Sequence, residues 1–267
     1  IGTAKISHAE RFTHTGKYIP HYMLDVVEPN ETYSVAQYKV AVEELIAQIS
    51  AKGKLPLLVG GTGLYVQAVI DPYKFEPIPV DWEYRKKLQQ LAQEKGNEFI
   101  HSQLAKVDPI SAKKLHPNDL RRIIRALEVY QATGKPIWAD HQVGKKKSRY
   151  NLSIIGINMP RPLLYERIEQ RVEKMIAQGL IAEVKDLLNK GYSSNLPAMQ
   201  SIGYKQICFY LKGKCTLEEA INLIKRDTRR LAKRQLTWFR RDKRIKWFEN
   251  LPDQEEKRIV SEIVAEI

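Results

Sequence analysis

The sequence predicts an α/β fold in which a core with a parallel sheet is interrupted by a helical insertion. Strand and helix patterns alternate at the start of the chain, which is typical of α/β proteins. Only helical patterns follow, and an alternating apolar strand pattern returns at Tyr150–Asn158. We therefore assign residues 1–73 and 146–267 to the α/β core and residues 74–145 to the insertion.

The first part of the core contains two strand–helix units. Residues His21–Val27 are predicted to form a strand, and Ser34 is a good N-cap for a helix that ends near Ala51. Leu55–Val59 is short and wholly apolar, as strands of a buried parallel sheet are. It leads through Gly60-Gly61-Thr62-Gly63 into a helix that ends near Ile70. This turn suits an anionic ligand, because strand ends and helix N-termini meet there, but a tight structural turn explains the glycines equally well.

The insertion is predicted to be entirely helical. Three prolines between Asp71 and Val80 mark its beginning. Helices are predicted for Asp81–Lys95, Glu98–Val107 and Asp119–Thr133, and a basic link over residues 144–149 leads back to the core strand.

The rest of the core is predicted to be mostly helical. Pro162 suits the first turn of a helix that runs to Gln178, with Gly179 after its end. Another helix ends at Gly191, and a long basic helix is followed by an amphipathic one.

The composition is that of a soluble basic protein. The net charge is +13, the pI is about 9.5, and 43% of the residues are hydrophobic, which excludes general disorder and favours anionic partners. Cys208 and Cys215 have no zinc-site spacing, and two thiols in a chain of 267 residues indicate a reducing compartment. No apolar run is long enough to span a membrane, so we expect a cytoplasmic protein without a membrane partner.

The stretch from Lys225 to Lys246 holds eleven Lys or Arg residues and only two acids. On a helix most of these cations share one face, opposite an apolar face on which Trp238 and Phe239 are expected to pack inward. Charge runs are usually solvated faces, but here the acids that would form i,i+4 pairs are mostly missing. The pattern therefore favours contact with a phosphate backbone.

Two further helices carry closely spaced arginines. Arg121, Arg122 and Arg125 follow a turn at His116–Asp119, and their mutual repulsion calls for an anion, either a ligand or Glu128. Arg167 and Arg171 form a second i,i+4 pair, which Glu166 and Glu169 could neutralise. The segment Ser201–Lys205 is either a base-contacting loop or a simple helix start.

Taken in order, many short segments of the chain resemble motifs of the tRNA dimethylallyltransferase (tRNA isopentenyltransferase) family. The matching segments are Ile1–Lys5, Pro20–Asp25, Tyr33-Ser34, Leu57–Tyr65, His116–Asp119, Arg125–Tyr130, Arg167–Arg171, Gly203–Gln206 and Ala232–Trp238. Each motif is weak alone, but their common order over nearly the whole chain makes a chance match very improbable.

The resemblance implies a P-loop nucleotide-kinase-like core and an enzyme that transfers a dimethylallyl group from dimethylallyl diphosphate, with Mg²⁺, to N6 of the adenosine 3′-adjacent to the anticodon in tRNA. It implies a monomer in which Arg171 holds the diphosphate and Thr62 lies at the catalytic centre. The insertion would grip the anticodon stem-loop. The implied tRNA contacts are Thr62, Arg85, Arg121, Arg122, Ile123, Ile124, Arg125, Gln200, Ser201, Ile202, Gly203, Tyr204, Lys205, Arg230, Lys233 and Arg234.

One departure from the family pattern matters for activity. The family opens with a G-x-x-x-x-G-K-[ST] phosphate loop and an Asp-Ser pair whose Asp is the expected general base, and neither precedes Gly2 here. We therefore expect that the natural protein is longer at its N-terminus and that this chain alone is inactive. Two alternatives are prenyl transfer to a free adenine nucleotide and a non-catalytic RNA-binding protein.

Overall fold

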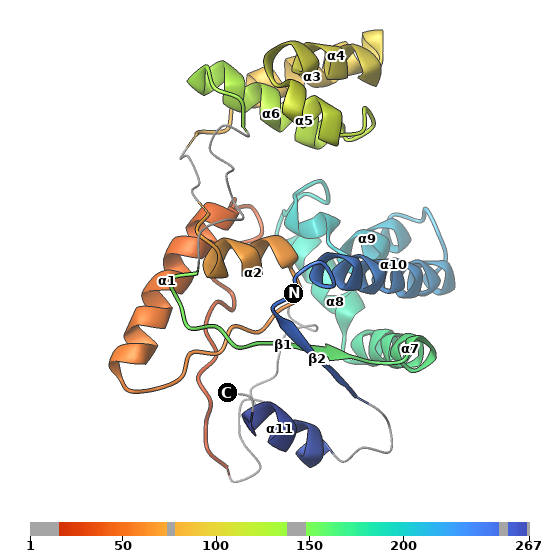
Figure 1. Ribbon diagram of the computed structural model, residues 1–267. Helices are drawn as coiled ribbons and strands as arrows, with labels where there is room; N and C mark the ends of the chain where they lie inside the picture. Colours follow the sequence, from red (N-terminus) through yellow and green to blue (C-terminus); the bar gives the residue numbers. More distant parts are fainter. Residues whose placement is uncertain (1–15, 74–77, 138–147, 251–255, 266–267) are drawn as a thin grey trace. The chain divides into compact units, whose positions relative to one another are not determined.

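A computed structural model of the chain describes residues 16–73, 78–137, 148–250 and 256–265 (Figure 1). The chain divides into two compact units. Residues Ile1–Val66 and Leu152–Ile267 form the core unit, and Gln67–Asn151 form the helical unit, within which the expected insertion lies. The Ile1–Lys5 motif and most of the basic link fall outside the described residues.

The helical unit consists of four helices around one apolar core. They are α3 (Trp82–Lys95), α4 (Asn97–Val107), α5 (Pro109–Lys114) and α6 (Leu120–Thr133). The core of this unit is formed by Leu88, Ala92, Ile100, Leu104, Ala112, Ile123, Ile124, Ala126 and Leu127. The three predicted helices are confirmed, with Asp81 capping α3 by accepting a hydrogen bond from the Tyr84 N–H at 2.9 Å.

Helix α5 was not predicted from the sequence. Its N-cap Asp108 accepts a hydrogen bond from the Ser111 N–H at 2.9 Å, and Pro109 occupies the first helical position. Both features are ordinary helix-start signals. The segment is so short that its apolar periodicity carries no information.

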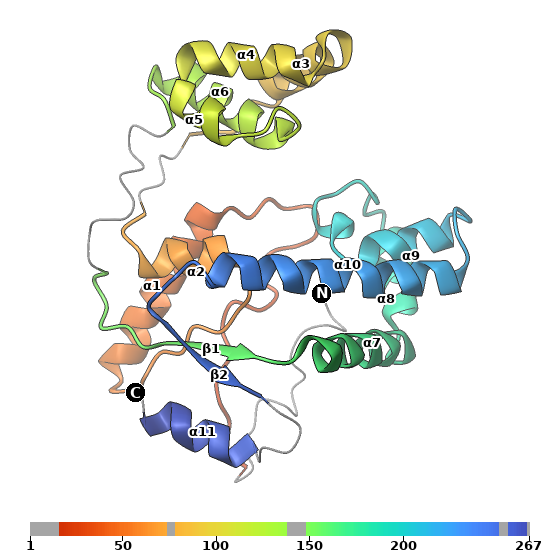
Figure 2. The ribbon, with the colours of Figure 1, turned by 45° about the vertical axis from the view of Figure 1, so that its right-hand side comes forward.

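The core unit combines a two-stranded parallel sheet with long helices (Figure 2). Strands β1 (Ile154–Asn158) and β2 (Ile245–Glu249) pair in the register Ile154 with Ile245 and Asn158 with Glu249. The helices are α1 (Val35–Ala51), α2 (Gly63–Ile70), α7 (Arg161–Ala177), α8 (Leu180–Asn189), α9 (Tyr204–Leu211), α10 (Leu217–Phe239) and α11 (Glu256–Ala265), with a short 3₁₀ turn at Ala198–Gln200. None of the described helices is both long enough and apolar enough to cross a bilayer.

Buried apolar side chains join α7, α8, α9 and α10 into one layer of helices. Their shared cluster is formed by Val172, Leu180, Val184, Met199, Tyr204, Ile207, Cys208 and Ile224. Ser34 is the N-cap of α1, as expected, and together with Gln37 it forms a capping box. Strand β1 is confirmed, whereas β2 was not predicted.

Two predicted strands, at residues 21–27 and 55–59, are wrong for the described part of the chain. Met23 and Asp25 have φ values of 61° and 51°, which break an extended backbone. Leu55–Val59 forms no strand with any described segment, and Val59 is 90% exposed. Apolar composition alone does not supply the neighbouring strand that backbone hydrogen bonds require.

Candidate nucleic-acid interface

Helix α10 packs directly against the glycine turn Gly60–Gly63. A Cβ on Gly61 would collide with the side-chain amide of Gln235, and a Cβ on Gly63 would collide with the indole of Trp238. Close approach of α10 therefore explains two of the glycines in structural terms. Thr62, between them, remains exposed at the start of α2, where a hydroxyl can reach a ligand.

We expect Gly63→Ala to lower the free energy of unfolding of the core unit by about 2 kcal/mol, because the rigid indole of Trp238 must shift to admit the methyl group. Gly60→Ala is the matched control, since a Cβ there meets no atom within 4 Å. Urea unfolding followed by tryptophan fluorescence measures both. Equal midpoints for the two variants would show that α10 does not pack on Gly63.

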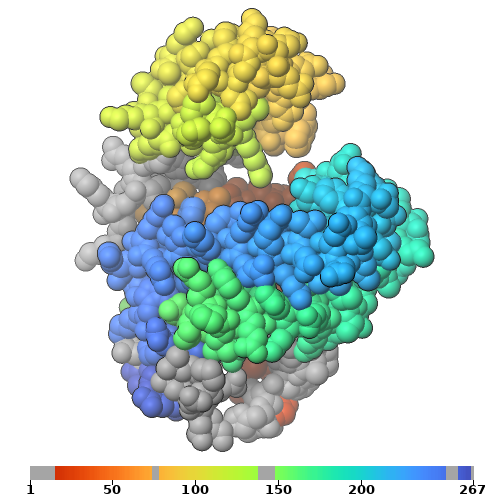
Figure 3. All heavy atoms as spheres, turned by 90° about the vertical axis from the view of Figure 1, so that its right-hand side faces the viewer, coloured from red at the N-terminus to blue at the C-terminus, as the bar shows by residue number. Residues whose placement is uncertain are grey.

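The first half of the α10 cation row is neutralised within the core unit. Lys225 Nζ and Arg229 Nη1 lie 2.8 Å and 2.6 Å from the carboxylates of Glu173 and Glu169 on α7, which runs beside α10 (Figure 3). Arg226 and Arg230 share Asp227, at 3.0 Å and 3.7 Å. None of these pairs is an i,i+4 pair within α10, as predicted, but the inference that the cations lack partners is wrong for this half, because two of the carboxylates come from α7.

The second half of the row differs, and we call Lys233, Arg234, Arg240 and Arg241 the terminal cations. All four are exposed and have no carboxylate partner among the described residues. Trp238 is exposed as well, contrary to the expectation that it packs inward, because its indole covers the glycine turn rather than the helical layer. The terminal cations thus form a cationic surface over the last turns and the end of α10.

The Gln200–Lys205 loop is fastened to α10 by a chain of hydrogen bonds. The Gly203 N–H donates to Gln206 Oε1 at 2.9 Å, and Gln206 Nε2 donates to Asp227 Oδ2 at 3.0 Å. Gly203 has a φ of 99°, which favours glycine. Burial alone would raise the pKa of Asp227, but hydrogen bonds from Arg226 and Gln206 hold that pKa below its ordinary value. Asp227 therefore stays ionised as an anchor for the loop.

The loop is also the start of a helix, since α9 begins at Tyr204. The Tyr204 side chain is buried and its hydroxyl donates to Glu183, so it is not available to stack on a base. Gln200 Nε2 donates to the Ser194 carbonyl at 2.7 Å, and Ser201 Oγ donates to the Ala198 carbonyl at 2.8 Å. The placement of the Tyr204 side chain therefore argues against its implied RNA contact, and so does that of Ile202, which packs against the same apolar cluster.

The arginines of the helical unit converge on Glu128, a buried carboxylate of α6. Arg85 and Arg125 donate to it, which identifies the internal anion that the arginine spacing calls for. Arg122 pairs with Asp119, and Arg121 is exposed with no recorded partner. Burial alone would raise the pKa of Glu128, but the arginine hydrogen bonds hold that pKa below its ordinary value.

Two neighbours of these arginines do not face solvent. Ile123 and Ile124 are buried in the core of the helical unit. Their implied role as tRNA contacts is not supported by this placement, because a helix that exposes Arg121 and Arg122 turns the next two side chains inward. His116 and Asn118 form the turn before α6, with the Asn118 N–H donating to His116 Nδ1 at 3.2 Å.

The second arginine pair lies on the exposed side of α7. The two acids that could neutralise it are engaged elsewhere: Glu166 accepts from Gln170 at 3.1 Å, and Glu169 accepts from Arg229 at 2.6 Å. Arg167 and Arg171 are both exposed. The assignment of Arg171 to a diphosphate stays a prediction.

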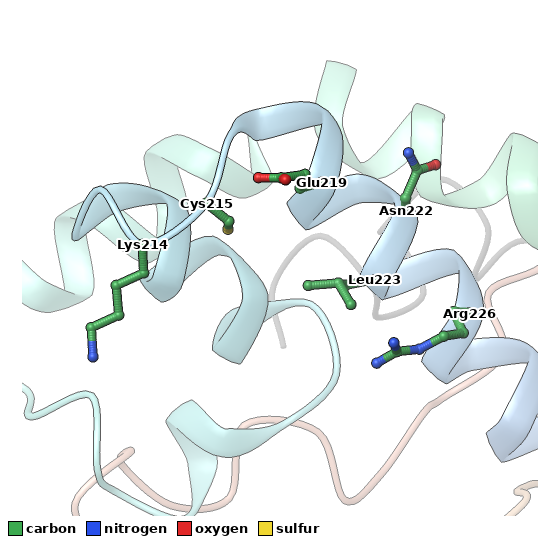
Figure 4. A pocket seen from close by; sticks show the side chains of 6 residues that line it. All are labelled: Lys214, Cys215, Glu219, Asn222, Leu223 and Arg226. Carbon is green, nitrogen blue, oxygen red and sulfur yellow. The ribbon is translucent and has the colours of Figure 1, made fainter.

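A shallow pocket of about 440 Å³ lies at the start of α10, and none of the residues that line it is among the predicted site residues (Figure 4). It is lined by Lys214, Cys215, Glu219, Asn222, Leu223 and Arg226. Within the described ranges, no three His, Cys, Asp or Glu side chains converge as a metal site. The expected Mg²⁺ stays a prediction, since this ion is usually held by one or two carboxylates together with substrate phosphates and water.

Exposed arginine and lysine side chains on both units, held on rigid helices, define a basic α/β protein built to bind a polyanion such as a nucleic acid. The family model described as IPP transferase matches residues 1–242 of the chain. The chain therefore belongs to the IPP transferase family.

Individual relatives agree with this membership. The chain is 54% identical to the tRNA dimethylallyltransferase of Carboxydothermus hydrogenoformans, over 100% of this chain and 84% of that protein. It is 52% identical to the tRNA dimethylallyltransferase of Moorella thermoacetica, over 96% of this chain and 79% of that protein.

Solved structures are similar to the chain over most of its length. The full-length tRNA isopentenylpyrophosphate transferase from Bacillus halodurans has a TM-score of 0.68 at 42% identity, over 99% of this chain and 81% of that one. A eukaryotic dimethylallyltransferase acting on tRNA has a TM-score of 0.73 at 26% identity, over 91% of this chain and 64% of that one.

Proposed function

We propose that the protein transfers a dimethylallyl group from dimethylallyl diphosphate to N6 of the adenosine 3′-adjacent to the anticodon in tRNA. Family membership supports the prenyl transfer, and the names of the closely similar relatives give tRNA as their acceptor. The observation in this chain that supports tRNA as the acceptor is the row of terminal cations, which have no carboxylate partner among the described residues. A polyanion neutralises such a row, whereas a small acceptor does not need it.

The reaction breaks an allylic C–O bond and forms a C–N bond, while the amine loses a proton and diphosphate leaves. Negative charge grows on the leaving group, so a fixed cation at that point stabilises the transition state. Arg171, exposed on α7, is the proposed partner of the diphosphate. A carboxylate that accepts the amine proton would assist the attack, and we assign no residue of this chain to that role.

The acceptor adenine must leave its stack to reach the prenyl donor. We propose that the helical unit contacts the anticodon stem-loop through Arg85, Arg121, Arg122 and Arg125. In the core unit, the loop from Gln200 to Lys205 and the cations Arg230, Lys233 and Arg234 would hold the RNA backbone. Thr62, exposed at the glycine turn, would contact the RNA near the reacting base.

Fluorescence anisotropy with a labelled anticodon stem-loop tests the acceptor. We expect binding that weakens steeply with salt and that a large excess of AMP does not reverse. Displacement by AMP, with prenyl transfer to AMP rather than to the stem-loop, would favour the free nucleotide as acceptor. Stem-loop binding without any affinity for dimethylallyl diphosphate would favour a non-catalytic RNA-binding protein.

A prenyl-transfer assay on the same stem-loop tests the chemistry. Transfer of the dimethylallyl group from dimethylallyl diphosphate to the stem-loop would support the proposed reaction, whereas binding of both substrates without transfer would count against it. RNA binding is measured separately, so the interface can be tested whether or not the chain turns over.

A further inference from the structure

Glu128 accepts four hydrogen bonds although its side chain is only 2% exposed. Arg85 donates through Nε at 2.8 Å and Nη2 at 2.7 Å, and Arg125 donates through Nη1 at 2.5 Å. The Asp81 N–H, at the start of α3, supplies the fourth bond at 2.9 Å. One buried carboxylate on α6 thus fixes an arginine from each of two helices, and it is bound in the two-pronged geometry that orients a guanidinium most strictly.

Arg85 is confined from a second direction. Its guanidinium lies 5.4 Å from the ring centre of Trp82, which is 63% exposed. The carboxylate holds the edge of the guanidinium that carries Nε and Nη2, and the indole lies beside the group, so Nη1 has no hydrogen-bond partner among the described residues. The side chains of Arg85 and Arg125 are still 26% and 35% exposed. Both guanidiniums are therefore held from behind and remain open to an incoming anion.

The cluster keeps a positive excess after this pairing. One carboxylate serves two guanidiniums, and exposed Arg121 lies one helical turn before Arg125. A free arginine loses much side-chain freedom when it grips a phosphate, and an arginine that is already fixed loses less. A buried anion can in this way strengthen the binding of another anion.

We propose that Glu128 is a positioning residue that presets Arg85 and Arg125 for contact with the tRNA backbone. This inference rests on the proposed function, because it takes RNA to be the ligand of these arginines. It differs from two simpler roles. If Glu128 only neutralised charge, its removal would strengthen RNA binding; if it only tied α3 to α6, its removal would change stability and leave the affinity alone.

The test compares Glu128→Gln with Glu94→Gln in binding to a labelled anticodon stem-loop. Glu94 is exposed on α3, so both variants add the same net charge and only one disturbs the arginines. We expect Glu128→Gln to weaken binding about tenfold and to flatten the dependence of log K on log salt by about one to two units. Glu94→Gln should bind as well as the parent or slightly more tightly. Glu128→Asp keeps the negative charge but has a shorter side chain that does not reach both arginines. If Glu128→Gln does not fold, the stem-loop affinity of Glu128→Asp is measured in its place.

The double variant Arg85→Ala/Arg125→Ala separates the two levels of the claim. If it binds the stem-loop as the parent does, the helical unit is not the interface and the proposed function fails there. If it weakens binding while Glu128→Gln and Glu128→Asp do not, the positioning role alone is overturned. The role is supported if Glu128→Gln weakens binding in the parent and has no further effect in the double variant.

Discussion

Replacing the terminal cations Lys233, Arg234, Arg240 and Arg241 by glutamine is expected to weaken binding of an anticodon stem-loop about a hundredfold at moderate salt. These four side chains are exposed on α10 and its end, and none has a carboxylate partner in the described part of the chain. Each phosphate contact releases counterions, so the loss should also reduce the slope of log K against log salt by about three to four units. Anisotropy titrations at several salt concentrations give both quantities.

A matched control removes four charges elsewhere in the core unit. Lys52, Lys54, Lys185 and Lys190 are exposed and have no recorded partner, so their replacement by glutamine changes the net charge equally. Only a few-fold loss is expected from the long-range field, because separated surface charges are screened within about 10 Å. If the control variant loses as much affinity as the α10 variant, RNA binding depends on net charge alone and the terminal cations are not a specific contact surface.

Ile123→Ala is expected to lower the stability of the helical unit by about 3 kcal/mol and to leave RNA affinity unchanged. Ile123 is fully buried with Leu88, Ile100 and Leu104, so truncation leaves a cavity among well-packed neighbours. Hydrogen exchange of the α6 amides measures the loss in the helical unit itself, because a chain with two units need not unfold in one step.

Ile110→Ala is the comparison for this substitution. Ile110 lies on α5 of the same unit but is exposed, so the same chemical change should alter stability by less than about 0.5 kcal/mol. RNA affinity is measured at a temperature where both variants are folded. A tenfold loss of affinity in folded Ile123→Ala would restore the contact role that the family resemblance implies for this residue.

Local signals in the sequence were enough for most helices and for few of the strands. Ser34, Asp81 and Gly134 are cap residues whose effect acts within one turn, and the helices they bound are confirmed. Strand β2 pairs with a segment some ninety residues earlier in the chain, so no local pattern indicates it. Leu55–Val59 has the composition of a strand, but no described segment pairs with it.

The same distinction applies to the candidate interface. The surplus of cations around α10 is visible in the sequence, but which of them lack a carboxylate partner is not, because Glu173 and Glu169 lie 52 and 60 residues away from their partners on α10. Motif matching assigned one role to the whole run from Arg121 to Arg125, whereas helix geometry divides it between solvent and core. Glu128 could have been recognised from the sequence, because it lies on the buried side of α6 and a buried carboxylate needs cationic partners.

The packing of α10 on the glycine turn has an evolutionary consequence. Gly61 and Gly63 belong to one motif, and Gln235 and Trp238 belong to another more than a hundred and seventy residues later. The side chains of Gln235 and Trp238 nevertheless occupy the space that a Cβ on Gly61 and on Gly63 would need. The end of the flexible Gln235 side chain can move aside for a side chain at Gly61, but a side chain at Gly63 requires the rigid indole of Trp238 to shift or to be replaced by a smaller group. Gly63 and Trp238 are therefore expected to change together or not at all, so that their joint presence in a sequence reports one physical contact rather than two independent signatures.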